Sequence, residues 1–287
     1  MSNQRPGARC RGRLAPRAVH LHQADAIGHH VIIRLVDDRT IATSGAARRI
    51  AASSLCRVAD PFGLLAFGIA DTHLHVLLAA DRLQAGECAR RVEISLNQRL
   101  RLRARFEPAR VRAVESQAHL QRAFLYVLRQ PERHGLEVDP AHDGTSLPDL
   151  VGLRVGGSNM KTRVAAVLPR MDLAALTEGL ELTPRENSRL DFALLRESAA
   201  AAFGLGELRR RGQVHHRAHR AATHAASHLS AEQLATLLDT SACFVRRLRM
   251  EPPHPHELRA IMLQLSLRTA IAGRARANHE PTQKFTA

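Results

Sequence analysis

The sequence predicts an α+β protein in which an antiparallel sheet with helices on one face is followed by an all-α module. Three observations support this fold class. Short apolar and β-branched runs alternate with amphipathic stretches up to about residue 130, glycine and proline gather between residues 136 and 184, and helical periodicity dominates afterwards. The expected parts of the chain are a basic disordered arm at 1–24, an α+β domain at 25–140, a connector at 141–184, a helical domain at 185–273 and a tail at 274–287.

The elements of the α+β domain follow from the spacing of apolar residues and from turn signals. The stretch "HVIIRLV" is rich in β-branched residues and stops at two aspartates, as a strand does before a turn. Ser44 is a typical helix N-cap, and Pro61 ends the amphipathic segment that Ser44 begins. The expected elements are a strand at 30–36, a helix at 44–60, strands at 64–71 and 73–80, a basic helix at 83–105, a strand at 110–116 and a helix from 117 to about 130.

The chain carries a large excess of positive charge. Lysine and arginine number 42 against 27 acidic residues, which gives a net charge of +15 and a pI near 11.3. Only Lys161 and Lys284 are lysines, and the planar guanidinium of arginine suits phosphate. An arginine-favouring genome explains the preference for arginine over lysine equally well, but not the net excess. We therefore expect a polyanionic partner. The arm at 1–24 either tracks phosphate or is a plain unstructured terminus.

Cysteine usage and hydropathy exclude several other classes of protein. The four cysteines are far apart and form no CxxC pair, which argues against a zinc knuckle and against a disulfide framework. No window holds eighteen continuous apolar residues, and the arginine-bearing start is not followed by the apolar core of a signal peptide. We expect a soluble cytoplasmic protein with reduced thiols and no membrane partner.

Two histidines lie in the apolar stretch "IADTHLHVLLAAD". Alternate side chains of a strand share a face, so His73 and His75 should point the same way while Leu74 enters the core. Two neighbouring neutral imidazoles are half of a metal site. The spacing alone is a weak signal, because His20 and His22 repeat it outside any apolar strand.

The only tyrosine of the chain, Tyr126, is placed away from the apolar stripe of its helix. At 3.6 residues per turn, Arg122, Tyr126 and Gln130 line one face, and the apolar residues from Leu120 to Leu128 line another. A tyrosine in this position is available for chemistry. Taken alone, it is more typical of an amphipathic residue at a domain surface.

The histidine strand and the tyrosine helix together resemble the REP-associated tyrosine transposases, which are single-tyrosine HUH transposases. The resemblance covers residues 28 to 153 and includes the stretches "HHVIIRLVDD", "AFGIADTHLHVLLAAD", "SLNQRLRLRARF" and "LYVLRQPERHGL". It implies a ferredoxin-like HUH nuclease domain, with Tyr126 as the nucleophile and His73, His75 and Gln130 as ligands of Mg²⁺ or Mn²⁺. Two residues depart from the family pattern: Thr72 and Gln130 stand where asparagine is usual.

The resemblance also implies a reaction and a substrate. Tyr126 would attack a phosphodiester of single-stranded or hairpin DNA and form a 5′-phosphotyrosine and a free 3′-OH. A phenol with a pKa near 10 needs help to ionise, which the metal or Arg122 could give; His119 is a further acceptor but is better explained as a solvated helix histidine. The predicted DNA contacts of this domain are Arg99, Arg101, Arg103 and Arg122.

The stretch "LSAEQLATLLDTSACFVRRLR" has the spacing of a helix-turn-helix. Ser230 is a typical N-cap, and Asp239 replaces the usual turn glycine, a place where aspartate tolerates a left-handed backbone. The stretch resembles modules appended to some REP-associated transposases and, more loosely, the DNA-binding domain of the bacterial replication initiator. An ordinary helical hairpin with a basic rim is the alternative. The predicted DNA contacts here are Ser241, Arg246, Arg247 and Arg249.

The sequence thus predicts a metal-dependent single-strand DNA endonuclease and strand transferase that acts at hairpins. Two other interpretations stay open: a domesticated DNA-binding protein that does not cut, and a transcription regulator whose first domain is only a scaffold. The sequence also leaves open a monomer or a homodimer with exchanged active sites.

Overall fold

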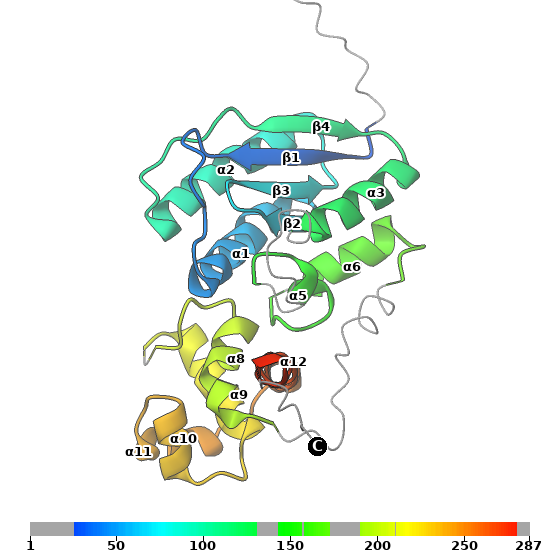
Figure 1. Ribbon diagram of the computed structural model, residues 1–287. Helices are drawn as coiled ribbons and strands as arrows, with labels where there is room; N and C mark the ends of the chain where they lie inside the picture. Colours follow the sequence, from blue (N-terminus) through cyan, green and yellow to red (C-terminus); the bar gives the residue numbers. More distant parts are fainter. Residues whose placement is uncertain (1–25, 131–142, 157, 173–189, 210, 280–287) are drawn as a thin grey trace, which may run out of the picture.

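The computed structural model describes residues 26–130, 143–156, 158–172, 190–209 and 211–279. The expected basic arm at 1–24 lies outside these residues. The first half of the chain contains a sheet and its covering helices (Figure 1). Its elements are β1 Gly28–Arg34, α1 Gly45–Ala59, the 3₁₀ turn Asp60–Phe62, β2 Leu64–Ile69, β3 His73–Leu78, α2 Arg82–Leu100, β4 Arg110–Val114 and α3 Gln117–Leu128.

The four strands form one antiparallel sheet in the order β2-β3-β1-β4. The expected α+β class is confirmed, and Ser44 caps α1 by accepting a hydrogen bond from the amide of Ala47. In the register of the sheet, Ile32 of β1 lies between His75 of β3 and Arg110 of β4. Residues that are direct neighbours across strands share a face. One row of side chains therefore joins the histidine strand to the arginines of β4.

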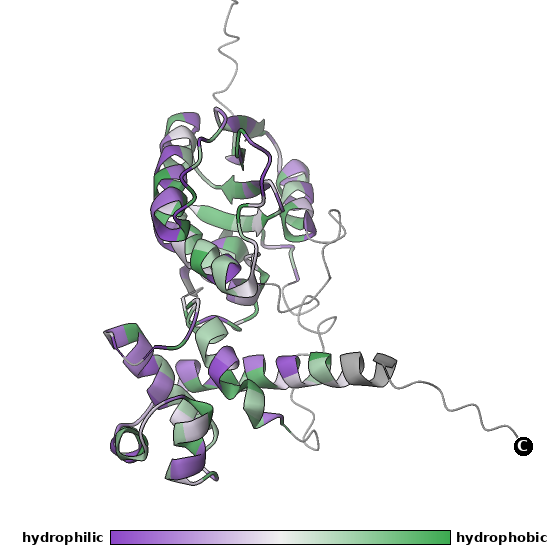
Figure 2. Ribbon diagram, turned by 60° about the vertical axis from the view of Figure 1, so that its left-hand side comes forward, coloured by the Kyte–Doolittle hydropathy of each residue, from purple (hydrophilic) through white to green (hydrophobic). Residues whose placement is uncertain are grey.

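Helices cover both faces of the sheet, and the expectation of helices on one face is wrong. Helix α3 lies on the face of His75, because the Tyr126 ring contacts the His75 ring. Helices α1 and α2 pack against each other on the opposite face, which Figure 2 shows from the side. Both Leu74 and Leu77, which alternate along β3, are fully buried. A strand that is apolar on both faces needs a covering layer on each.

Helix α2 ends at Leu100, five residues before the expected end at 105. Arg101 adopts a left-handed backbone with φ of 53°, which stops the helix. The Asn97 side chain then bonds the following loop, donating to the carbonyl oxygen of Ala104 at 3.1 Å and accepting from its amide at 3.4 Å. The basic residues after Leu100 therefore lie on a loop and not on a helix face.

Part of the expected connector packs on the sheet. It holds the helices α5 Leu147–Leu150 and α6 Ser158–Val167. The backbone before α5 bonds the exposed edge of β2, since the amide of Ile69 donates to the carbonyl of Gly144 and the amide of Ser146 to that of Phe67. Such pairing covers an edge that would otherwise attract other chains. The buried side chains that this region adds to the sheet core are Leu150, Met160, Val164 and Leu168.

The second half of the chain is helical and has its own apolar core. The 3₁₀ turn Phe192–Leu194 precedes the helices, and the last helix runs past the expected domain end at residue 273 to His279. The core includes Leu195, Leu234, Val245 and Ile261. The helices are α8 Leu195–Ala202, α9 Gln213–Ala225, α10 Ala231–Leu237, α11 Ala242–Arg249 and α12 Pro255–His279.

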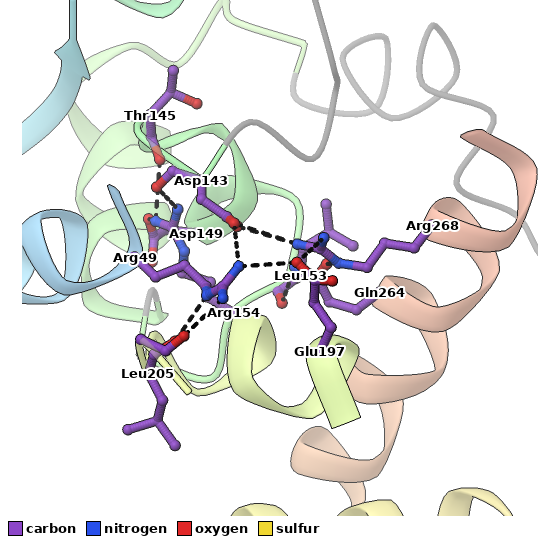
Figure 3. Close-up of polar contacts among 11 residues, drawn as sticks. Arg49, Asp143, Thr145, Asp149, Leu153, Arg154, Glu197, Leu205, Gln264 and Arg268 are labelled. Carbon is purple, nitrogen blue, oxygen red and sulfur yellow. Dashed lines mark hydrogen bonds and ion pairs between the residues drawn. The ribbon is translucent and has the colours of Figure 1, made fainter. Parts of the chain in front are cut away.

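A buried network of charged groups joins the two halves (Figure 3). Arg49 of α1 is 6% exposed; it pairs with Asp143 at 2.9 Å and donates to the carbonyl oxygens of Leu205 and Gly206. Arg268 of α12 approaches the same Asp143 at 3.4 Å. The network therefore fixes α1 against the segment after α8 and against α12. No helix in the described part of the chain combines the length and the apolar character needed to cross a membrane.

Candidate functional site

The aromatic rings of three predicted site residues lie close together. The ring centroids of His73 and His75 are 4.8 Å apart, and those of His75 and Tyr126 are 5.5 Å apart. The period of β3 places both histidines on the face that α3 covers, and the period of α3 turns Tyr126 towards them. His75 is 2% exposed, whereas His73 and Tyr126 are half-buried. The phenol and both imidazoles can therefore act on one group.

A glycine sets the approach of α3 to the sheet. Gly68 of β2 is the register partner of His75, and it lies under the end of α3. A Cβ at this position would lie 2.5 Å from the carbonyl oxygen of Val127 and 3.4 Å from the side chain of Gln130. Only a residue without a side chain lets the helix come so near. Gly68 thus positions the turn of helix that carries Tyr126.

The two histidines predicted as metal ligands each have a polar partner at the Nδ1 atom. The Nδ1 of His75 shares a 2.9 Å hydrogen bond with Nε2 of His30, and the Nδ1 of His73 lies 3.4 Å from the Thr72 hydroxyl. Thr72, which departs from the family pattern, thus contacts the first histidine. Nε2 is then the atom through which each imidazole would bind a metal, and the partner at Nδ1 fixes the orientation of the ring.

His30 was not predicted as a site residue. Burial, with smaller contributions from Arg112 and His119, lowers its pKa to about 4. It is therefore neutral near pH 7, and its Nε2 can accept a hydrogen bond from the Nδ1–H of His75. The sequence signal was weak. His29 and His30 both begin an apolar strand, and only the register shows that His30 is the one on the same face of the sheet as His75.

A cavity of about 220 Å³ opens between the histidines and the edge strand β4. Ile32 lies in the middle of the cavity wall. Three arginines also line the cavity, and none of them was predicted as a site residue. Arg34 ends β1, while Arg110 and Arg112 alternate along β4 and therefore point to the same face. The alternation of the two arginines was visible in the stretch "RVRAV" of the strand expected at 110–116. The lining residues are Ile32, Arg34, His73, His75, Glu107, Pro108, Arg110, Arg112 and Tyr126.

Gln130, the expected third metal ligand, does not line this cavity. It is 1% exposed, and its amide nitrogen donates to the carbonyl oxygen of Tyr126 at 3.1 Å. No cluster of three or more His, Cys, Asp or Glu side chains with metal-ligand geometry occurs among the described residues. Of the three predicted metal ligands, His73 and His75 therefore line the cavity, and metal binding by them and by the amide oxygen of Gln130 stays a prediction.

The other arginines predicted for this domain are exposed and lie outside the cavity lining. Arg122 is on α3 one turn before Tyr126, Arg99 is in the last turn of α2, and Arg101 and Arg103 are in the loop that follows. Arg101 and Arg103 both have a left-handed backbone, with φ near 50°. This loop leads to Glu107 and Pro108 in the cavity wall. The contact of these arginines with DNA stays a prediction.

In the helical half, α10 and α11 are joined by a short turn. Asp239 has φ of 52°, so the expected left-handed turn residue is confirmed. Ser230 caps α10 with a capping box, and the Ser241 hydroxyl caps α11 by accepting from the amide of Phe244. Ser241 therefore has a structural role in addition to its predicted DNA contact.

The predicted arginines of α11 have different surroundings. Arg246 is exposed and pairs with Glu232 at 2.5 Å, and Arg247 lies over the Phe244 ring at 5.1 Å. Arg249 is half-buried and donates to the carbonyl oxygens of Ser227 and Leu229. The exposed side chains Cys243, Arg246, Arg247 and Met250 follow the i, i+3, i+4, i+7 spacing of one helix face.

Comparisons of the chain with models of protein families, with curated protein sequences and with solved structures find no match.

Proposed function

We propose that this chain is a transposase-like enzyme that nicks and joins single-stranded DNA at hairpins, of the REP-associated tyrosine type within the HUH family. The observation that carries the proposal is the convergence of the Tyr126 ring with the imidazoles of His73 and His75 in one cavity. The strand order β2-β3-β1-β4, with α1 and α2 as the connections between strands, supports the proposal of a ferredoxin-like split β-α-β fold for the first half of the chain. On this fold we propose the HUH nuclease activity.

The proposed reaction uses groups of this chain for attack and for positioning. The phenol oxygen of Tyr126 attacks the phosphorus, the bond to the 3′ oxygen breaks, and the 3′ oxygen takes up a proton while the phenol gives one away. His73 and His75 would hold Mg²⁺ or Mn²⁺, and the bound metal would polarise a non-bridging phosphate oxygen and neutralise charge at phosphorus. Attack of a 3′-OH on the 5′-phosphotyrosine reverses the step, so joining needs no ATP.

The helices α10 and α11 support a second DNA contact. We propose that they form a helix-turn-helix, with the exposed face of α11 as its recognition surface. Val245 and Leu248 point into the core while Arg246 and Arg247 stay outside, as a helix that enters a groove requires. This contact would hold duplex or hairpin DNA while the sheet domain acts on the single strand.

A second candidate function is a DNA-binding protein that does not cut. The placement of Gln130 outside the cavity lining favours it, because two imidazoles alone are a weaker metal site than three ligands. The positive charge of the chain serves this function equally well.

A covalent-adduct gel separates the two. Purified protein is mixed with labelled single-stranded hairpin DNA from its own genomic flanks, with Mn²⁺ or with EDTA. We expect a band that survives denaturation, needs the metal and disappears in Tyr126→Phe and in His75→Ala, while Arg57→Gln on the opposite face of the sheet keeps it. DNA binding with steep salt dependence and no adduct on any flanking hairpin would overturn the enzyme proposal in favour of the non-cutting protein.

A further inference from the structure

We propose that Arg110 and Arg112 of β4 form an anion subsite that holds a backbone phosphate of single-stranded DNA beside the cavity of Tyr126. This inference rests on the proposed function and adds to it the part of the site that places the strand.

The geometry of the sheet brings these arginines to the histidines. His75, Ile32 and Arg110 are successive neighbours across β3, β1 and β4, and His30 is the neighbour of Arg112 in the adjacent row. Adjacent strands are about 4.8 Å apart, so β3 and β4 are separated by about 10 Å. An arginine side chain that turns inward from β4 spans much of this distance, and both arginines line the cavity together with Tyr126.

The charges of the lining favour an anion. Three guanidinium groups face a single carboxylate, that of Glu107. Arg34 is paired with Asp38 at 2.5 Å, and Arg110 is only loosely paired with Glu107 at 3.8 Å. Within the described part of the chain, Arg112 has no carboxylate within ion-pair distance. Arg112 and Arg110 are therefore the cations that are available to a ligand.

The apolar surface between the histidines and the arginines favours a particular kind of anion. Ile32 separates the histidines from the arginines, so one face of the cavity is apolar while its two ends are polar. A nucleotide has the matching pattern, with a phosphate at either side of an apolar sugar edge. Guanidinium groups bind phosphate oxygens with two parallel hydrogen bonds. A phosphate next to the attacked one would fix the strand and hold the scissile phosphate against the Tyr126 hydroxyl.

Binding of an unpaired oligonucleotide to Tyr126→Phe protein tests the subsite without the chemical step. Into this background we would introduce Arg112→Gln, Arg112→Lys, the Arg110→Gln/Arg112→Gln pair and, as a matched loss of one charge, Arg57→Gln on α1. We expect Arg112→Gln to lose roughly tenfold in affinity and about 0.7 in the slope of log affinity against log salt. Arg112→Lys should keep the slope and lose part of the affinity, and Arg57→Gln should behave as the parent protein does.

Inorganic phosphate as a competitor separates a general phosphate site from a DNA subsite. If phosphate weakens DNA binding no more than sodium chloride does at the same ionic strength, the site binds the DNA strand and not free phosphate. Equal affinities of Arg112→Gln and Arg57→Gln would overturn the subsite whether or not an adduct forms. Loss of binding in Arg112→Gln, combined with no adduct in the wild-type protein, would keep the subsite and overturn only the enzyme proposal.

Discussion

Replacement of Gly68 by alanine should displace Tyr126 without unfolding the protein. The added Cβ would lie 2.5 Å from the carbonyl oxygen of Val127, where ordinary contact begins at 3.4 Å, so α3 must move by about 0.9 Å. Overpacking of this kind costs about 1–3 kcal/mol, and the loss of unfolded-state freedom from Gly to Ala offsets about 0.4–1 kcal/mol. We expect a net loss of stability of about 1–2 kcal/mol.

The effect on the site should exceed the effect on stability. A displacement of about 1 Å in a reacting group can lower a rate by about a hundredfold, and we expect a fall of that order in the rate of adduct formation. Tyr126 is the only tyrosine and the chain has no tryptophan. Tyrosine fluorescence and the tyrosine band of the near-ultraviolet circular dichroism, which lies at longer wavelength than the phenylalanine bands, therefore report on this residue alone. Both signals should change in Gly68→Ala even if no DNA is cut.

Gly86→Ala is the matched control. Gly86 lies in the interior of α2, and a Cβ there would meet no atom within 4 Å. Alanine should stabilise this helix by about 0.5–1 kcal/mol and leave the tyrosine signals unchanged. Wild-type tyrosine spectra and wild-type thermal stability in Gly68→Ala would refute the reasoning that Gly68 positions α3.

Three further predictions follow from buried polar groups. His30→Phe removes the hydrogen bond to Nδ1 of His75, so the Mn²⁺ concentration for half-maximal adduct formation should rise about 10–100-fold; an unchanged Mn²⁺ titration would contradict this role. Glu257 is fully buried and pairs with Arg217 and Arg220. Glu257→Ala should cost about 2 kcal/mol, because Arg217 loses its carboxylate partner but is partly solvated and Arg220 keeps only the 4.0 Å contact to Glu251; urea unfolding measures the loss against the conservative Glu257→Gln. Burial lowers the pKa of His219, so the unfolded chain takes up the proton first and stability should fall as the pH drops below about 6.5. His219→Gln can still donate to the carbonyl of Arg209, and its unfolding temperature should depend less on pH between 7.5 and 5.5; an unaltered pH dependence would exclude His219 as the cause.

Element positions in the first half could be predicted because local pattern and tertiary packing agree there. The strands and helices lie within a few residues of their expected bounds, and the predicted cap at Ser44, like that at Ser230 in the second half, is where its residue type suggests. The end of α2 was missed because Arg101 takes a left-handed conformation that arginine rarely favours. The pairing of residues 144–146 with β2 was missed because it runs through the backbone, which leaves no side-chain period.

The candidate site could be predicted only in part, for a similar reason. His73, His75 and Tyr126 carry a distinctive chemistry at a recognisable spacing. The roles of Arg110, Arg112 and His30 depend on which strand lies beside which, and that order is set by the whole sheet. In the sequence Gly68 looks like any glycine of a strand. Only the close approach of α3 to the sheet shows why a side chain cannot be accommodated there. Motif and local periodicity thus predict the proposed reactive groups, whereas register and packing show which other side chains lie beside them.

The buried network between the halves bears on how DNA would be bound. Arg49 has partners at all three guanidinium nitrogens, and Asp143 accepts from both Arg49 and Arg268. A shift of one half against the other would leave buried charges without partners, at a cost of several kcal/mol. The network therefore favours one relative placement of the two cores. If α11 holds the duplex and the sheet cavity holds the strand, their separation is set by the protein, and cleavage should occur at a fixed distance from the duplex contact.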